Sequence, residues 1–130
     1  MGLSDCKVNT AIAVTDIGKA KEFYEGKLGL SGSGEAPDGG IDYACGAGSQ
    51  VHVYPSASAG GSGATIAFWE TEDVDGLVDE LSSAGVSFEQ YDQEPIKTNE
   101  KGIAEFENGE KGAWFKDPDG NVMAVGNPTS

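Results

Sequence analysis

The stretch that decides the fold is residues 114–125, which reads WFKDPDGNVMAV. Two short apolar runs flank the polar segment DPDGN. Pro118 presets the backbone angle of one turn residue, Gly120 and Asn121 tolerate a positive φ, and the aspartates can cap the turn. The pattern therefore predicts a β-hairpin with a tight turn at residues 117–121.

The first half of the chain predicts a strand, a helix and two further strands. Residues 7–14 alternate between a mostly apolar face and a second face, as expected of a strand. Apolar residues then recur at helical spacing over residues 17–28, after capping residues that can start a helix. A Gly-rich polar connection follows at residues 31–40. Residues 41–45 and 50–54 predict two paired strands.

The second half repeats this order after a flexible linker at residues 56–63. Residues 64–70 predict a strand, and a helix that begins at residue 74 and ends at Gly85 follows it. Residues 86–91 predict another strand. A long irregular stretch, residues 92–112, precedes the closing hairpin. Because the strand–helix order restarts, we interpret the chain as βαβββ twice, which predicts one domain built from two like modules, about residues 7–57 and 63–127.

Composition excludes several classes of function. The 130-residue chain has a net charge of -14, with eight basic residues that are all lysines. Nucleic acid is a poor partner, because phosphate contacts need lysine and arginine. The acidic balance either gives a solvated surface for solubility or salt tolerance, or favours cationic ligands. No apolar run is long enough to cross a bilayer and no secretory signal is visible, so we expect a cytoplasmic protein with no membrane partner.

The segments AVTDI (residues 13–17), FY (23–24), LGL (28–30) and FKDPDGN (115–121), with the repeat, resemble the vicinal oxygen chelate superfamily. That superfamily contains glyoxalases, bleomycin-resistance proteins and extradiol dioxygenases. The resemblance implies an α+β fold, in which paired βαβββ modules form a curled mixed sheet, or cup, with helices on its convex side. It also implies a homodimer. Whether the cup is completed within one chain or by exchange of modules between chains stays open.

The resemblance also implies four metal ligands on the concave face for the metal enzymes of the superfamily. These positions fall on Asn9, on His52 (or Tyr54 if the register slips by two), on Ile66 or Thr65, and on Ala124. At most one of them carries a true ligand, whereas a firmly held divalent metal needs at least three. We therefore expect no metal and no other cofactor.

His52 is the only histidine. Strand parity places His52 and Tyr54 on one face and the intervening valines on the other, where they should meet the helix. His52 and Tyr54 should then line the cup. A histidine there can contact a ligand or act as a general acid or base, and the alternative is a half-buried histidine that bonds to backbone.

The register of residues 64–70 leaves two alternatives. In the favoured one Ile66, Phe68 and Glu70 face the cup, and Glu70 can orient His52 or receive a cationic ligand. The other alternative turns Ala67 and Trp69 inward, together with Thr65. Further aromatic side chains can form a wall for a flat ligand. The candidates for this wall are Tyr54, Phe68, Trp114 and Phe115, of which Phe115 fits the core better.

The sequence favours a small-molecule-binding protein of the bleomycin-resistance type that works without a metal and binds a flat, cationic ligand in the cup. Its candidate ligand-binding residues are Asn9, His52, Tyr54, Phe68, Glu70 and Trp114. The alternative is a glyoxalase-like lyase or isomerase with an unorthodox metal site. A further enzymatic alternative is acid/base chemistry by His52, with Glu70 or Tyr54 assisting. A module for dimerisation alone is the third possibility.

Overall fold

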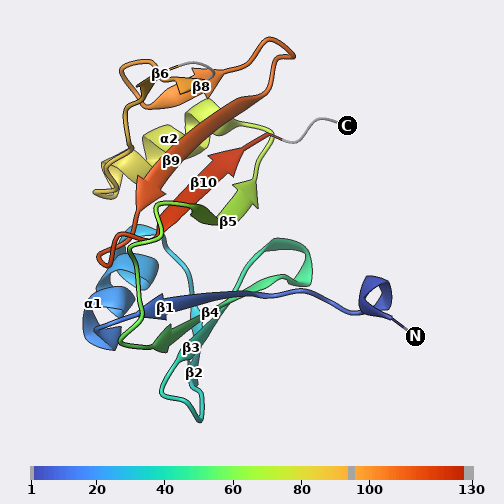
Figure 1. Cartoon of the computed structure of the whole chain (residues 1–130), viewed down its shortest axis with the longest axis vertical. Coiled ribbons are helices and arrows are strands. Elements are labelled where there is room, and N and C mark those ends of the chain that lie inside the picture. The colour runs from blue at the N-terminus through green and yellow to red at the C-terminus, as the bar shows by residue number, and fades with distance from the viewer. Residues whose placement is uncertain (1, 94–95, 128–130) are drawn as a thin grey trace.

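The structure of the protein is a computed structural model that describes residues 2–93 and 96–127. Two four-stranded sheets dominate it, with strand orders β1-β4-β3-β2 and β5-β10-β9-β8 (Figure 1). The strands of the first sheet are β1 (Thr10–Val14), β2 (Gly32–Glu35), β3 (Ile41–Ala44) and β4 (Gln50–Pro55). Those of the second are β5 (Thr65–Glu70), β8 (Ile103–Glu105), β9 (Lys111–Lys116) and β10 (Val122–Gly126).

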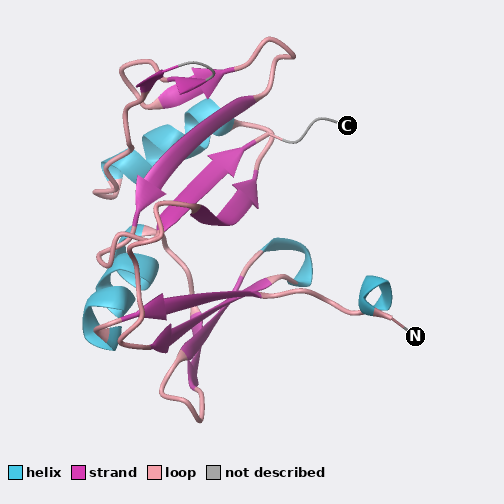
Figure 2. Ribbon diagram, viewed as in Figure 1, coloured by secondary structure: helices cyan, strands magenta, loops and turns pink. Residues whose placement is uncertain are grey.

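Each module carries one main helical segment, which packs on one face of its sheet (Figure 2). These are α1 (Ile17–Lys21), which continues as the π-helical turn η2 (Glu22–Lys27), and α2 (Val74–Ser83). Asp16 caps α1 by accepting from the backbone N–H of Gly18, and Asp73 caps α2 in the same way through Gly76. The remaining elements are short: η1 (Leu3–Asp5), η3 (Gly46–Gly48), β6 (Asp92–Gln93) and β7 (Ile96–Lys97).

The two sheets have the same topology. β1 pairs with β4, and β5 with β10, in parallel, and the remaining pairs in each sheet are antiparallel. The repeat, the mixed sheets and the α+β class expected from the sequence are therefore confirmed. The strands form two separate open sheets rather than one closed barrel.

Three assignments made from the sequence are wrong. The stretch at residues 92–112, expected to be irregular, contains β8 of the second sheet and the short strands β6 and β7. The polar connection at residues 31–40 contains β2. All four residues of β2 are exposed, so the sequence has no apolar alternation there that would predict a strand. Residues 86–91, expected to be a strand, contribute only a bridge between Phe88 and Phe115. The first strand also begins later than expected, because Val8 is 82% exposed and precedes β1.

One hydrophobic core joins the helix-facing sides of both sheets. It includes Ile12 and Val14 of β1, Val78 of α2 and Phe115 of β9. Burial of these side chains supplies the main driving force for holding the modules together. Among the described residues no helix is long and apolar enough to span a bilayer.

The turn between β9 and β10 lies where the two modules meet. The carboxylate of Asp117 is only 5% exposed. It accepts hydrogen bonds from the Tyr24 hydroxyl at 2.8 Å, the Asn121 backbone N–H at 2.9 Å and the Asn121 side-chain amide at 2.8 Å. Burial and the Asp117 carboxylate raise the pKa of Tyr24, which therefore stays a donor. A turn of the second module thus bonds a helix of the first.

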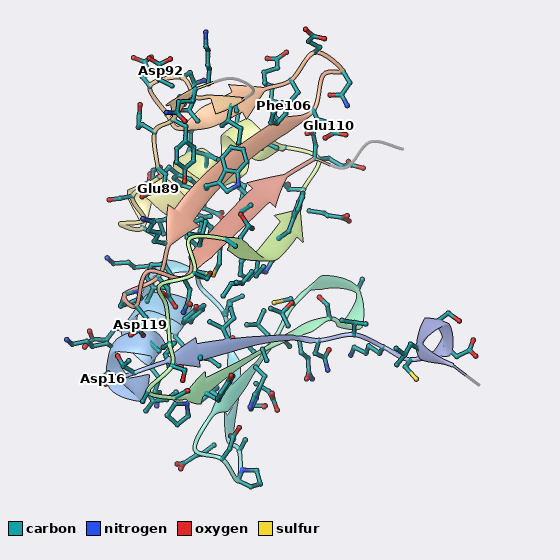
Figure 3. The ribbon with its side chains drawn as sticks, in the orientation of Figure 1. Asp16, Glu89, Asp92, Phe106, Glu110 and Asp119 are labelled. Carbon is teal, nitrogen blue, oxygen red and sulfur yellow. The ribbon has the colours of Figure 1, made fainter. Side chains whose placement is uncertain are left out.

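The same turn also holds the end of β1. The Asn121 side-chain amide donates to the Ala13 carbonyl at 2.9 Å. Asp119 accepts from the backbone N–H and the hydroxyl of Thr15, next to the Asp16 cap (Figure 3). These contacts fix where the second module sits relative to the first.

Candidate functional site

Each sheet has a helix-facing side, buried in the core, and an opposite side, here called its open face. Paired residues on neighbouring strands point to the same side of a sheet, and successive residues alternate. In β4 the valines 51 and 53 are buried under the helix, so His52 and Tyr54 lie on the open face of the first sheet. In the second sheet Phe68, Glu70 and Trp114 lie on the open face.

The register of β5 matches the favoured alternative from Ala67 onwards. Ala67 pairs with Met123 and is buried, and Trp69 stacks on Phe115 in the core. Phe68 and Glu70 therefore point away from the helix. A bulge precedes this stretch, so that Ile66 has no partner in the ladder, which neither alternative included.

His52 bridges two carboxylates on the open face of the first sheet. Its Nδ1 lies 2.7 Å from Asp42 Oδ1, and its Nε2 lies 2.8 Å from Asp38 Oδ2. Asp42 is the cross-strand partner of His52 on β3, and Asp38 lies in the turn between β2 and β3. The Tyr54 ring stacks nearly parallel to the imidazole, with centroids 5.8 Å apart.

This arrangement favours the doubly protonated imidazolium, because each ring nitrogen then donates to a carboxylate. The hydrogen bond to Asp38 raises the pKa of His52 above 6.5, and Asp42 adds to the effect while partial burial opposes it. The same bond, with the Gly40 backbone N–H, lowers the pKa of Asp38 below 3.8. Both ring nitrogens are within hydrogen-bond distance of a carboxylate.

An aromatic platform lies on the open face of the second sheet; it consists of Phe68, Tyr91 and Trp114. Phe68 is 60% exposed, an unusual state for so large an apolar side chain. Tyr91 meets Trp114 edge to face, with ring centroids 5.8 Å apart. Phe68 and Trp114 flank Ala124 in one row across β5, β10 and β9.

Two glycines allow the rings of Phe68 and Trp114 to lie against the sheet. Gly126 and Gly112 pair with each other in the next row. A Cβ at Gly126 would lie 3.1 Å from the Phe68 ring, and one at Gly112 would lie 3.4 Å from the Trp114 ring. Small residues therefore let the aromatic rings cover the backbone and present flat surfaces to the outside.

One carboxylate, that of Glu70, lies at the margin of the platform, and Glu110 lies farther along the sheet, at the turn before β9. Glu70 follows Phe68 by two residues on β5 and pairs with Gly126. Glu110 and Phe106 lie side by side at the β8–β9 turn, where the Phe106 backbone N–H donates to the Glu110 carbonyl (Figure 3). Aromatic faces bordered by carboxylates attract flat cations.

The predicted site residues do not form one constellation within a chain. His52 and Tyr54 are on one sheet, and Phe68, Glu70 and Trp114 are on the other. No hydrogen bond, ion pair or ring contact between these two sets is found within the described residues. Asn9 is exposed and precedes β1.

The sequence reasoning missed the partners of His52. It offered Glu70 as the orienting carboxylate, whereas Asp38 and Asp42 bond the imidazole. The contact of Asp42 could have been predicted, since Asp42 lies on a strand expected to pair with the strand of His52. The contact of Asp38 could not, because the position of Asp38 depends on the path of the turn before β3.

The donor set does not fit the divalent metal that the resemblance implies for the enzymes of the superfamily. Ala124 is buried on the floor of the platform and offers no donor atom. Ile66 offers none, and both nitrogens of His52 are engaged with carboxylates. Within the described ranges no group of three or more His, Cys, Asp or Glu side chains is placed to hold a metal ion.

Comparison with known proteins agrees with this architecture. A family model described as "Glyoxalase/Bleomycin resistance protein/Dioxygenase superfamily" matches residues 8–125. No curated protein matches the chain.

Several solved structures share the fold. A member of that superfamily from Sphaerobacter thermophilus is 24% identical, with a TM-score of 0.71 and coverage of 95% of this chain and 98% of that one. TnmS3, an antibiotic binding protein from Streptomyces sp. CB03234, is 24% identical, with a TM-score of 0.66 and 93% coverage of both chains. A lactoylglutathione lyase from Agrobacterium tumefaciens is 19% identical, with a TM-score of 0.65 and coverage of 94% and 92%.

Proposed function

The chain belongs to the glyoxalase/bleomycin resistance protein/dioxygenase superfamily, and we propose that within it the protein binds a flat small molecule on its aromatic platform. The observation that carries the proposal is the row Phe68–Ala124–Trp114, in which two aromatic side chains flank a small residue. The 60% exposure of Phe68 leaves a ring face available for stacking. Binding of this kind needs only a preformed surface.

Binding is favoured over catalysis by the state of His52. Its two ring nitrogens lie 2.7 Å from Asp42 and 2.8 Å from Asp38, so that neither nitrogen is free to meet a substrate. One protein with a similar fold is an antibiotic binding protein, which fits the same reading.

The ligand we propose is cationic as well as flat. The chain carries a net charge of -14, and Glu70 lies beside the platform on β5. A field of this sign concentrates cations and repels anions.

The proposal is tested by equilibrium dialysis of the full chain against two flat three-ring probes of opposite charge, proflavine and anthraquinone-2-sulfonate. We expect proflavine to bind saturably and at least about 10-fold more tightly than the sulfonate, because stacking is common to both while the charge favours only the cation. Equal affinities would remove the charge part of the proposal. No binding of either probe would contradict the stacking surface itself.

We propose that the protein works without a divalent metal. Ala124 stands where the resemblance places a metal-binding glutamate, and the other positions supply too few donors. Purified protein dialysed against zinc or nickel and then freed of excess ion should retain well under one equivalent by mass spectrometry. It should also show no turnover of methylglyoxal with glutathione. Stoichiometric metal together with turnover would establish the glyoxalase-like alternative instead.

We further propose that the chain forms a homodimer. Leu3 and Val8 are large apolar residues that lie outside the aromatic platform and are left exposed. A second copy that covers them removes apolar surface from water and leaves Phe68 free for the ligand. Light scattering should then give about twice the chain mass of 13.4 kDa, and the mass of a single chain at all concentrations would contradict this.

A further inference from the structure

The second sharply defined cluster of the molecule lies on the first sheet, away from the aromatic platform. It consists of the His52 imidazole and the carboxylates of Asp38 and Asp42. Asp42 is held by its strand, since β3 and β4 pair directly at Asp42 and His52. Asp38 is held by no strand, and its side chain is 49% exposed. The imidazole therefore connects a rigid carboxylate to one on a turn.

The turn that carries Asp38 is small and rich in glycine. The Ala36 backbone N–H donates to the Gly40 carbonyl at 2.7 Å, and the Gly40 backbone N–H donates to Asp38 Oδ1 at 2.8 Å. Gly39 has a φ of +84°, a conformation that other residues rarely adopt. Asp38 Oδ2 reaches out of this turn to His52, and that contact fastens the turn to the open face.

We propose that His52 is a proton-controlled clasp, which holds the turn at residues 36–40 on the open face of the first sheet while the imidazole is doubly protonated and releases it when one proton is lost. A neutral imidazole has only one N–H and can donate to one carboxylate. Asp42 is fixed opposite it on β3, so the proton stays on Nδ1. Nε2 then becomes an acceptor facing the Asp38 carboxylate, which has no proton to donate, and the contact turns repulsive.

Within residues 2–93 and 96–127, Asp38 and Asp42 are the charged groups that contact the imidazole. β1, which lies beside β4 on the other side, places Ala11 opposite His52 and has no titratable residue. On β4 itself the nearest open-face neighbours are Gln50 and Tyr54, of which Tyr54 stacks on the ring. From β3 and the turn the facing groups are Asp42 and Asp38.

The direction of the pH dependence follows from the two shifts. The pKa of His52 is raised above 6.5, so the stabilisation from the clasp is complete below 6.5 and is lost as the pH rises through the higher folded value. The pKa of Asp38 is lowered from 3.8, so the clasp persists on the acid side until the pH falls below that value. The clasp is therefore closed between the lowered pKa of Asp38 and the raised pKa of His52, and it opens as the pH rises through the latter.

Because the chain has a single histidine, one NMR titration tests this without any ligand. In wild-type protein the His52 Cε1–H signal should titrate with a pKa above 6.5, and the Cα–H signals of Gly39 and Gly40 should move with the same midpoint. Asp38→Asn should lower the His52 pKa and abolish the matching movement of the two glycines. Asp42→Asn should also lower the His52 pKa.

Asp79→Asn serves as the matched control, because Asp79 pairs with Lys101 on the second module. It should leave the His52 titration unchanged. A wild-type His52 pKa at or below 6.5 would overturn the clasp, and so would glycine signals that stay still while His52 titrates. Because these signals report on the turn directly, they do not depend on whether the platform binds a ligand.

Discussion

Replacing Asp117 with alanine should lower the free energy of unfolding by about 3 to 5 kcal/mol, because it leaves several buried donors without their acceptor. The substitution leaves the Tyr24 hydroxyl, which is fully buried, without its acceptor at 2.8 Å. It also removes an acceptor from the Asn121 backbone N–H and side-chain amide. Each buried donor left unsatisfied costs about 1 to 3 kcal/mol.

Urea unfolding followed by circular dichroism measures this change through the midpoint and the slope. Tyr24→Phe keeps the ring and removes only one donor to Asp117, so it should cost less, about 1 to 2 kcal/mol. Asp79→Ala breaks a pair whose two side chains are both about half exposed and should change stability by under about 0.5 kcal/mol. A loss below about 1 kcal/mol for Asp117→Ala would show that this turn does not join the modules.

Replacing Phe68 with alanine should weaken the binding of proflavine by roughly 10- to 100-fold, because stacking aromatic residues are typical energetic centres of a binding surface. Phe68 is 60% exposed, so the variant should fold with nearly unchanged stability. Trp114→Ala should weaken binding by a similar factor. Equilibrium dialysis of both variants beside wild type gives the comparison.

Trp69→Phe is the matched control for these variants, since Trp69 belongs to the same sheet but stacks on Phe115 on the helix-facing side. It should leave proflavine affinity within about 2-fold of wild type. Equal losses for Trp69→Phe and Trp114→Ala would instead indicate a site on the helix side or a general loss of structure.

The elements that the sequence predicts well are those with strong local signals. The hairpin around residues 117–121 has its turn chemistry and its flanking strands in one short segment. Both helices begin after aspartates that cap them, Asp16 and Asp73. The faces of β4 follow from simple alternation, because a shift of the strand register by one residue would expose Val51 and Val53 together.

The elements that the sequence does not predict depend on distant contacts. β2 consists of Gly32, Ser33, Gly34 and Glu35 and becomes a strand only because β3 lies beside it. Residues 86–91 alternate well but find a single bridge. The hydrogen bonds of Asp117 to Tyr24 join residues 93 positions apart, so no local pattern reveals that the family's hairpin turn is also the joint between the modules.

Ala124 connects the fold to the proposed function. The sequence of the β9–β10 hairpin is one of the motifs that resemble the superfamily. The strand after its turn, β10, has alanine at the position where the resemblance implies a metal-binding glutamate. In the structure this alanine lies between Phe68 and Trp114 across three strands. The position that lacks a metal-binding side chain thus lies between the two aromatic side chains of the platform.

The most direct test of the aromatic platform is a proflavine titration that follows the indole N–H signals of the two tryptophans in wild-type protein. Trp69→Phe assigns the signals. A flat ring stacked on the platform shifts the Trp114 signal saturably, with the affinity found by dialysis, and leaves the Trp69 signal nearly still. A Trp69 shift as large as that of Trp114, or no movement of Trp114 when the probe is bound, would contradict the account.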